Sequence, residues 1–382
     1  MMKVLLVCDN FYGIGNGLAT SARVTTKYLR EAGVDVRVLS KENDDPHGPQ
    51  PDYPLEKFHI PVFQGLVESF GYCFPKCDRA VIKEALEWCD VVHFESAFPL
   101  EWLAANLAVK MKKPRVATYH LHPENITFQI GMKNWHLLNH TLLCIFRNVV
   151  FDKCTDIQCP TENVRERLER YHFKAQKHVI SNGILLDDNA VSNVSAKEPY
   201  LVTCVGRLTR EKDQFTLLRA MKYSRHAGEI QLLFAGKGVK ERRYRRIAAR
   251  LQARGVLKYA PEFAYLTPDA LKELARRSYL NVHCAVIEVE GLSCIEFIRE
   301  GAVPVIAEGK LSATAQFALD DRSRFPAKDA RALAQRIDWW IEHPEERLKM
   351  GPEYMESARK YEIHKSIDSL VEMYRTAIEK QK

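Results

Sequence analysis

The sequence predicts an α/β protein made of two doubly wound domains, each with a parallel sheet covered by helices. Short apolar and β-branched runs alternate with stretches of helical periodicity along most of the chain, a pattern typical of parallel strands joined by crossover helices. The alternation stops once, in the polar segment Leu186–Pro199, and then begins again. A chain of 382 residues is also too long for one hydrophobic core, so we expect two domains facing a central cleft.

The first domain is expected at residues 1–186. Its apolar runs predict strands at Lys3–Cys8, Asp35–Leu39, Asp90–Phe94, Arg115–Tyr119, Asp156–Gln158 and His178–Ile180. The segments between them predict helices near Leu18–Ala32, Arg79–Trp88, Leu100–Met111 and Glu162–Tyr171. Gly33 stands where a C-cap glycine would end the first helix. We therefore expect strands and helices to alternate strictly in this domain.

The second domain is expected at residues 187–355, beginning in the polar linker. It repeats the same alternation, with strands predicted at Tyr200–Val205, Gln231–Phe234, Tyr279–Val282 and Val303–Ile306. The predicted helices are Asp213–Tyr223, Lys240–Arg254, Pro268–Arg277 and Ser293–Glu300. The tail, Pro352–Lys380, has the pattern of one long helix or two short ones. We expect its part at 356–382 to return to the first domain.

Composition narrows the class of protein without selecting a function. Asp9 interrupts the N-terminal apolar run after about six residues, so this run predicts a buried strand rather than a signal peptide. No stretch of about 18 uncharged apolar residues follows that would span a membrane. The ten cysteines lack the spacing of a zinc site, and we expect reduced thiols in a cytosolic protein. The net charge of +7 favours anionic partners in general.

A glycine-rich segment, Gly13–Leu18, follows the first predicted strand and opens a helix. Glycines such as Gly15 and Gly17 let the backbone approach a phosphate, and a helix N-terminus offers free N–H groups. Leu18 occupies the place of the third glycine in a dinucleotide-binding fingerprint, which disfavours a nicotinamide or flavin site. A tight turn without a ligand is the alternative interpretation.

Two charged segments of the second domain also lie at predicted strand ends. Arg207 and Lys212 follow a strand and precede a helix, where two cations can neutralise a diphosphate leaving group. In the later segment, Gly291 and Leu292 start a predicted helix, with Glu288 before it and Glu296 one turn inside. Helix-start amides suit phosphate oxygens, and carboxylates suit sugar hydroxyls. A solvated charged turn, and a helix with acids near its first turn, are the alternatives.

Five segments occur in the order of motifs from a known family. Glu288–Glu296 is similar to E-x-F-G-L-x-x-x-E, with Glu290 at the usual aromatic position, and Gly206–Lys212 resembles G-R-L-x-x-E-K. The segments Val179–Ile184, Leu233–Gly238 and Gly301–Ala307 resemble V-I-P-N-G-I, L-x-x-x-G-x-G and G-x-P-V-I-A. These motifs are those of the family-four retaining glycosyltransferases, which have the GT-B fold. The resemblance covers nearly the whole chain.

The resemblance implies roles for these residues in moving a sugar from a nucleotide-sugar donor. Arg207 and Lys212 would bind the diphosphate, Glu288 the donor sugar and Glu296 the ribose. The loop with Gly15 and Gly17 and the amides of Gly291 and Leu292 would complete the phosphate site. His120, at the end of a predicted strand, matches the family's histidine near the reacting carbon. The catalytic candidates are therefore His120, Glu288, Arg207 and Lys212. The resemblance also implies a UDP-sugar donor, retention of the anomeric configuration, no metal and no cofactor.

The expected acceptor is a lipid hydroxyl. Two segments, around His122–Thr127 and Leu311–Leu319, look similar to bacterial synthases that glycosylate diacylglycerol or ceramide-type lipids. His122 and Glu124 are the candidate acceptor-binding residues. The segment Phe128–Phe151 has the pattern of an amphipathic helix, with Lys133 and Arg147 nearby, and a basic run lies at 237–250. Packing in the domain's own core and a solvated face are the respective alternatives.

These features predict a hexosyltransferase bound peripherally to the inner face of the membrane through an anionic surface. The sugar, glucose or galactose, is left open, as are UDP against GDP, the exact acceptor and the oligomeric state. Within the fold, the alternative acceptor is a soluble sugar or a lipid-linked oligosaccharide. A non-catalytic nucleotide-binding or nucleic-acid-binding protein is the alternative of another class. The chain lacks the interleaved aromatic and basic strand of single-strand binders, so we expect no nucleic acid.

Overall fold

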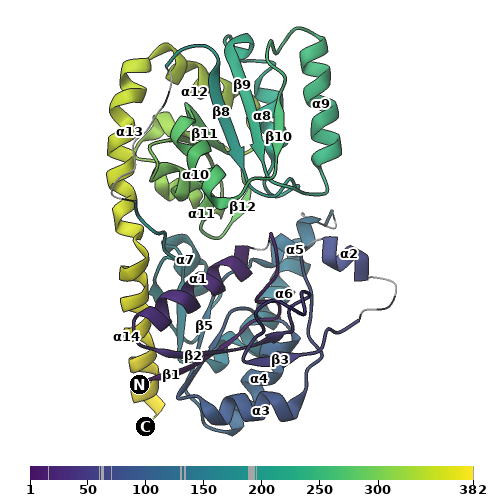
Figure 1. Cartoon of the computed structure of the whole chain (residues 1–382), viewed down its shortest axis with the longest axis vertical. Coiled ribbons are helices and arrows are strands. Elements are labelled where there is room, and N and C mark those ends of the chain that lie inside the picture. Colours follow the sequence, from purple (N-terminus) through teal and green to yellow (C-terminus); the bar gives the residue numbers. More distant parts are fainter. Residues whose placement is uncertain are drawn as a thin grey trace. The chain divides into compact units, whose positions relative to one another are not determined.

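The chain forms two compact units, which Figure 1 shows in a computed structural model. The structure describes residues 1–15, 17–59, 61, 64–69, 71–129, 131–132, 135–187, 194 and 196–381. The first unit comprises Met1–Thr127, Met132–Gly183 and Ile363–Lys382, and the second comprises Phe128–Gly131 and Ile184–Glu362. Most of the expected linker, at 188–193 and 195, and the expected membrane-facing Lys133 lie outside the described residues.

The first unit contains a seven-stranded parallel sheet with the order β3-β2-β1-β4-β5-β6-β7. The strands are β1 (Lys3–Val7), β2 (Asp35–Lys41), β3 (Tyr53–Leu55), β4 (Val91–Phe94), β5 (Arg115–Thr118), β6 (Asp156–Cys159) and β7 (Gln176–Val179). In the central part, Val4 pairs with Val36 on one side and Val91 on the other. Strand numbers fall from β3 to β1 across one half of the sheet and rise from β4 to β7 across the other. The boundary between β1 and β4 is therefore the topological switch point, where ligands of doubly wound sheets bind.

The helices of the first unit, except the C-terminal helix α14, lie between successive strands of the sheet. They are α1 (Gly17–Glu31), α2 (Gln64–Ser69), α3 (Arg79–Trp88), α4 (Pro99–Lys110), α5 (Pro123–Gln129), α6 (His136–Val149), α7 (Glu162–Arg170) and α14 (Ile363–Gln381). Local sequence fixes several of their starts. Asp78 caps α3 by accepting from the amides of Ala80 and Val81, and Thr161 caps α7 through the amide of Val164.

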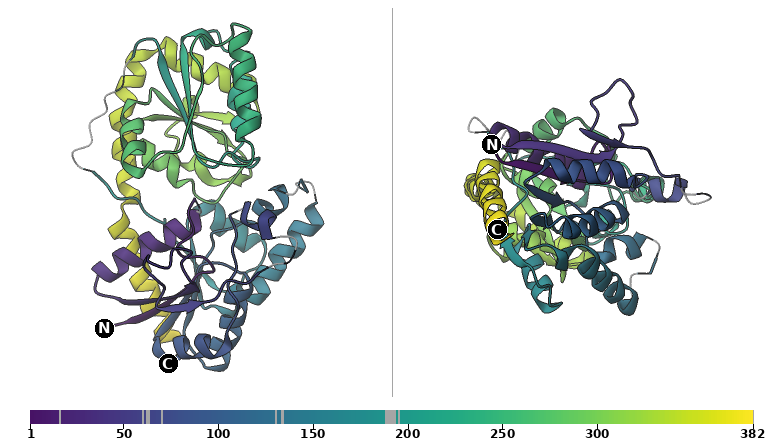
Figure 2. Two further views of the ribbon diagram at one scale, coloured as in Figure 1. Left: turned by 45° about the vertical axis from the view of Figure 1, so that its right-hand side comes forward. Right: turned by 90° about the horizontal axis from the view of Figure 1, so that it is seen from below.

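The helix α14 belongs to the first unit although it follows the second unit in the chain. It contacts α1, β4, β5 and β6, and it appears beside them in yellow in Figures 1 and 2. Its apolar face, which includes Ile367, Leu370 and Met373, is buried in the core around β1 and β2. The hydroxyl of Tyr374 lies 2.7 Å from Nδ1 of His93, and Nζ of Lys380 donates to Asp156 at 2.7 Å.

The second unit repeats this architecture with a six-stranded parallel sheet of order β10-β9-β8-β11-β13-β15. Its strands are β8 (Tyr200–Val205), β9 (Ile230–Ala235), β10 (Glu262–Ala264), β11 (Leu280–His283), β13 (Val303–Glu308) and β15 (Arg324–Pro326). A separate ribbon pairs β12 (Ile287–Glu288) with β14 (Leu311–Ser312). The helices are α8 (Gln214–Ala220), α9 (Glu241–Ala253), α10 (Pro268–Arg277), α11 (Leu292–Ile298), α12 (Ala330–Glu342) and α13 (Pro344–Ala358).

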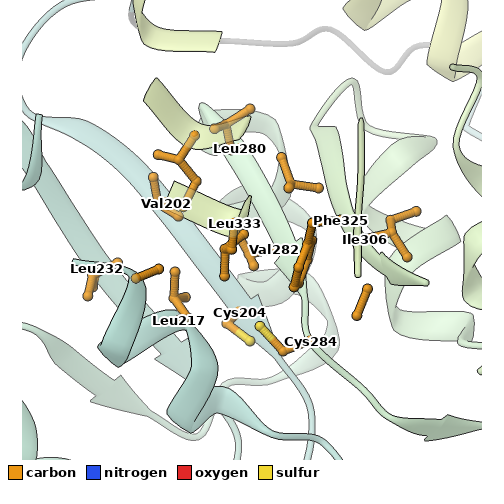
Figure 3. Close-up of a cluster of buried hydrophobic side chains, with 14 of the residues drawn as sticks. Val202, Cys204, Leu217, Leu232, Leu280, Val282, Cys284, Ile306, Phe325 and Leu333 are labelled. Carbon is orange, nitrogen blue, oxygen red and sulfur yellow. The ribbon is translucent and has the colours of Figure 1, made fainter. Parts of the chain in front are cut away.

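Apolar side chains from both faces of this second sheet close its core. Figure 3 shows Val202, Leu232 and Val282 among the buried side chains that pack between the strands and the helices α8 and α12. One cation is buried here as well. Arg347 of α13 is 1% exposed and donates hydrogen bonds to the backbone carbonyls of Tyr279, Ser278 and Gly301, so its charge is satisfied by peptide dipoles.

The domain boundaries differ from the expected ones at the C-terminal end. We predicted a second domain that ends at residue 355 and a terminal helix from 356. In the structure residue 356 lies inside α13, and the chain returns to the first unit at Ile363. The tail is divided between two helices: α13 runs through Pro352 and ends at Ala358, and α14 begins at Ile363. Among the described residues, no helix is both long and apolar enough to cross a membrane.

Candidate active site

The predicted donor-site residues of the second unit lie at the carboxyl ends of β8 and β11. The strand order of this sheet reverses between these two neighbours, so the segment after β8, with Arg207 and Lys212, lies at the switch point. Glu288 ends the short strand β12, and Gly291 immediately precedes α11.

Lys212 and Glu288 form an ion pair in which the ammonium group of Lys212 donates to Oε2 of Glu288. Their side chains are 17% and 16% exposed, so solvent reaches the pair only in part. The imidazole Nε2 of His283, which is buried at the end of β11, lies 3.5 Å from the same carboxylate oxygen. These three residues form the centre of the site. Lys212 and Glu288 were predicted from the sequence, whereas His283 was not.

The two neighbours of Glu288 determine its charge. Burial alone would raise the pKa of Glu288, but Lys212 and His283 outweigh that effect and hold the pKa well below its ordinary value. Burial also lowers the pKa of His283, so its ring is neutral near pH 7. At neutral pH the site therefore contains a carboxylate, an ammonium ion and a neutral imidazole. A carboxylate of this kind accepts hydrogen bonds from hydroxyl groups.

The loop that carries Arg207 is fixed by its neighbours. The guanidinium group of Arg207 donates to buried Glu211 at 3.3 Å, and the amide of Gln214 donates to the carbonyl of Arg207 at 2.9 Å. A Cβ on Gly236 would lie 2.1 Å from the carbonyl oxygen of Gly206. A glycine is required at this position because the loops after β8 and β9 touch there, which explains the glycine motif at 236–238.

The remaining predicted donor-site residues lie around the start of α11. Gly291 has φ of 95°, and a Cβ there would lie 2.6 Å from Oγ1 of Thr314, so this position also requires glycine. Leu292 is the first residue of α11, and Glu296 lies one turn further with an exposed side chain. Glu290, which replaces the family's aromatic residue, is buried. No observation tests the ligand roles of these residues, which stay predictions.

In the first unit, His120 is held by a carboxylate that the sequence analysis missed. Nε2 of His120 lies 2.7 Å from Oε2 of Glu95, which follows β4 and is buried. Burial alone would raise the pKa of Glu95, but His93 and His120 outweigh it and lower that pKa. Because an ionised carboxylate only accepts hydrogen bonds, Nε2 of His120 carries the proton in this contact. The position of Glu95 directly after a fully apolar strand was the signal available in the sequence.

A second pair of buried acids lies at the end of β1. Asp9 and Glu101 are both buried and their carboxyl groups interact with each other. The hydroxyl of Ser96 donates to Oδ2 of Asp9 at 3.0 Å. Burial raises the pKa of Asp9 to about 6, and burial together with the charge of Asp9 raises the pKa of Glu101 well above its ordinary value, so the two carboxyl groups titrate as a pair in which Glu101 holds its proton more tightly.

The glycine-rich segment follows Asp9 and leads into α1. Gly15 is exposed with φ of 71°, Gly17 begins α1, and Asn16 lies outside the described residues. The guanidinium group of Arg23, a residue of α1, donates to the carbonyl of Phe11 at 2.5 Å and to that of Gly13 at 3.3 Å. These bonds fix the first residues of the loop, whereas the backbone at Gly15 and Gly17 is exposed.

The two candidate acceptor residues have protein partners. His122 is fully buried, and its Nδ1 lies 3.2 Å from the hydroxyl of Tyr119. Both carboxylate oxygens of Glu124 accept from one nitrogen of Arg167, at 2.8 and 2.9 Å. Each side chain thus makes internal contacts that a structural role would explain, and no observation tests acceptor binding by either residue.

Three known proteins are similar to this chain in sequence or in structure. The α-monoglucosyldiacylglycerol synthase of Streptococcus pneumoniae is 23% identical over 323 residues, which cover 81% of this chain and 71% of that protein. The solved catalytic domain of cholesterol-α-glucosyltransferase from Helicobacter pylori is 39% identical in an alignment that spans 43% of this chain and 100% of that solved chain, with a TM-score of 0.39. The HepE protein of Anabaena, solved with UDP-glucose, matches 98% of this chain and all of its own with a TM-score of 0.72 at 14% identity.

Two family models match adjacent parts of the chain. The model of Glycosyltransferase Family 4 matches residues 15–188, and that of Glycosyl transferases group 1 matches residues 187–356. Their junction falls in the segment between the two sheets. The fold, with two doubly wound parallel sheets, agrees with that of HepE. The chain therefore belongs to the family-four glycosyltransferases, has the GT-B fold and is related to a lipid glucosyltransferase.

Proposed function

We propose that this enzyme transfers glucose or galactose from a UDP-sugar to a lipid hydroxyl, such as that of diacylglycerol or ceramide, with retention of the anomeric configuration. The observation that carries the proposal is the contact of Lys212 with Glu288 beside His283, at the switch point of the second sheet. It puts a cation for a leaving diphosphate next to a carboxylate for sugar hydroxyls.

In the proposed reaction, Arg207 and Lys212 stabilise the diphosphate while charge develops on it. Glu288 holds hydroxyl groups of the sugar, Glu296 the ribose, and the backbone near Gly291 and Leu292 the phosphate oxygens. Fixed cations of this kind act most strongly where water is excluded, and Lys212 is largely buried. Since two cations of the protein supply the charge, we propose that the reaction needs neither a metal ion nor a cofactor.

The chemical step exchanges two bonds at the anomeric carbon. The bond from that carbon to the phosphate oxygen breaks, and a bond to the acceptor oxygen forms on the same face of the sugar. The acceptor's proton passes to the departing phosphate oxygen. The sugar is positive at the intermediate stage, and we assign to His120 the role of facing that charge with a ring held in place by Glu95. The loop at Gly15 and Gly17 would contact phosphate through its exposed backbone.

A lipid acceptor requires the enzyme to work at a membrane, and two surface features support this. Trp135 is 58% exposed and Leu137 is 79% exposed, whereas Leu143 and Phe146 of the same helix, α6, are buried in the first unit. The helix thus has both a core face and exposed apolar side chains, which suit a membrane interface. The name of the Streptococcus pneumoniae relative also indicates a diacylglycerol lipid.

The second feature is the basic run around α9. Residues 237–258 carry nine basic side chains and one acidic one, a net charge of +8, which exceeds the net charge of +7 of the whole chain. Arg242, Arg246 and Arg250 are exposed and spaced by four residues, so they share one helix face. Such a face attracts anionic headgroups. We accordingly propose peripheral binding to the inner membrane surface.

The catalytic proposal is tested by transfer from radiolabelled UDP-glucose and UDP-galactose to diacylglycerol or ceramide in mixed micelles. Glu288→Gln and Lys212→Ala are expected to lower turnover about 100-fold or more, since each removes a charged group used in the transition state. Lys222→Ala, an exposed lysine of the same unit, is the control and keeps full activity. Wild-type activity that survives Lys212→Ala and Glu288→Gln would refute the proposal.

The acceptor is tested by mass spectrometry of the products, with soluble sugars and lipid-linked oligosaccharides offered beside the two lipids. These are the competing acceptors for this fold. Sedimentation with phosphatidylglycerol vesicles tests the membrane contact. Leu137→Asp, or the pair Arg242→Glu and Arg246→Glu, should weaken it, whereas Leu348→Asp, on another exposed leucine, should not. Binding that is unchanged in the variants and in 1 M salt excludes both surfaces.

A further inference from the structure

Glu288 has one neighbour on its solvent side and others behind it. Lys212, with 17% of its side chain exposed, reaches the carboxylate from the partly exposed side. His283 is 3% exposed and lies behind, at the end of β11. Ser312, also 3% exposed, lies opposite Glu288 in the pairing of β12 with β14. Paired residues of parallel strands have side chains on the same face, so the side chains of Ser312 and Glu288 share one face of this ribbon. We call His283 and Ser312 the rear groups because both are buried.

The rear groups have hydrogen-bonding capacity that the structure does not use. Within the part of the chain that the structure describes, Nε2 of His283 and Oγ of Ser312 are buried and make no hydrogen bond. The 3.5 Å from Nε2 of His283 to Glu288 is longer than the usual N–H to O contact of about 2.9 Å. Unpaired buried groups are costly and therefore call for a reason.

Binding of the donor supplies that reason. Under the proposed function, on which this inference rests, Lys212 serves the diphosphate of the donor. An ammonium group that turns to two phosphates gives up its close contact with Glu288. A partly buried carboxylate that loses its cation is strongly destabilised unless other donors replace the lost contact.

We infer that His283 is a positioning residue that holds the Glu288 carboxylate when Lys212 turns to the diphosphate, with the hydroxyl of Ser312 as a second donor. The ion pair of Lys212 with Glu288 is then the resting arrangement of the site. Donor binding exchanges the partners: Lys212 takes the phosphates, and Glu288 takes the sugar hydroxyls in front and His283 behind. The neutral ring suits this task, because it donates a hydrogen bond without competing with Lys212 as a charge.

Two titratable groups lower the pKa of Glu288: Lys212 from the loop after β8 and His283 from β11. When Lys212 turns to the diphosphate, His283 alone still stabilises the ionised carboxylate. Removal of the imidazole should therefore raise the pKa of Glu288 in the donor complex, and this effect is absent if His283 only fills space.

The experiment compares His283→Leu, which removes the donor, with His283→Gln, whose amide N–H reaches a similar position. For His283→Leu we expect kcat to fall about 10- to 100-fold with UDP-glucose, or with UDP-galactose if the wild type uses that donor. The dissociation constant for UDP alone, which has no sugar, should change less than about twofold. The acid limb of kcat should move up by about one pH unit, and His283→Gln should recover most of kcat.

Other outcomes overturn the inference. Full kcat in His283→Leu would show that Glu288 needs no rear support. Equal losses in the Leu and Gln variants, together with weaker UDP binding, would show a structural role. Ser312→Ala provides a second variant if His283→Leu does not fold, and a normal kcat and acid limb in it would count against the inference. A wild type that transfers no sugar, or a Lys212→Ala variant with full activity, instead refutes the proposed function.

Discussion

The buried acid pair of Asp9 and Glu101 should make the first unit less stable as the pH rises. Burial raises the pKa of Asp9 from 3.8 to about 6 in the folded protein. Between these values the folded state keeps a proton that the unfolded state has lost, so stability falls with rising pH across this window. At about 1.4 kcal/mol for each pKa unit, the part of the loss that comes from Asp9 is about 3 kcal/mol above pH 6. Glu101, whose pKa is raised as well, adds to the loss in the same direction.

Asp9→Asn removes this loss, because the amide is neutral at every pH and can still accept from Ser96. The variant and the wild type should be about equally stable near pH 4, and above pH 6 the variant should be more stable by up to about 3 kcal/mol. Urea unfolding from pH 4 to 8 measures the difference. Asp368→Asn, on an exposed aspartate of α14, is the control and should show no pH-dependent difference. A gain that does not vary with pH, or a loss at pH 7, would refute the reasoning.

Three further substitutions test the site and the core. Gly236→Ala would place Cβ 2.1 Å from the carbonyl oxygen of Gly206 and displace the loop of Arg207, so the affinity for UDP in calorimetry should fall about tenfold or more. The control Gly228→Ala, whose Cβ would meet open space, should not change this affinity. Glu95→Gln, which leaves the tautomer of His120 unfixed, should lower kcat about tenfold at unchanged UDP affinity, and normal kcat would contradict the role of Glu95. Arg347→Met leaves three buried carbonyls without donors and should cost about 3 kcal/mol or more in thermal unfolding; a melting temperature equal to that of the wild type would contradict it.

The order and type of the long elements were predictable, because periodicity is a local property of the sequence. The short edge strands were not. Tyr53–Leu55 and Arg324–Pro326 are three-residue strands that contain proline, and they are strands only because a neighbouring strand pairs with them. Proline disfavours a central strand but is tolerated at a sheet edge. The helix Ala330–Glu342 was not predicted, although Asp329 caps it by accepting from the amides of Arg331 and Ala332.

Glycines and charges at strand ends located the segments of the candidate site, but not its contacts. Lys212 and Glu288 are 76 residues apart, and their ion pair depends on how the loop after β8 and the separate strand β12 are placed in the fold. The sequence analysis assigned them to different parts of the donor and did not foresee that they bind each other. His283 and Glu95 were missed although both lie at the carboxyl ends of strands next to a switch point. Such positions are worth inspecting in any doubly wound sequence.

The place of α14 in the chain has a consequence for how the protein is made. A ribosome delivers the whole second unit, residues 184–362, before it delivers the helix that covers β4, β5 and β6. Until then, His93 lacks its contact with Tyr374, and the first sheet lacks the apolar face of α14 that includes Ile367 and Leu370. Nascent domains usually fold in the order of synthesis. Here the unit that begins the chain is completed last, so part of its apolar core stays exposed until α14 has been synthesised.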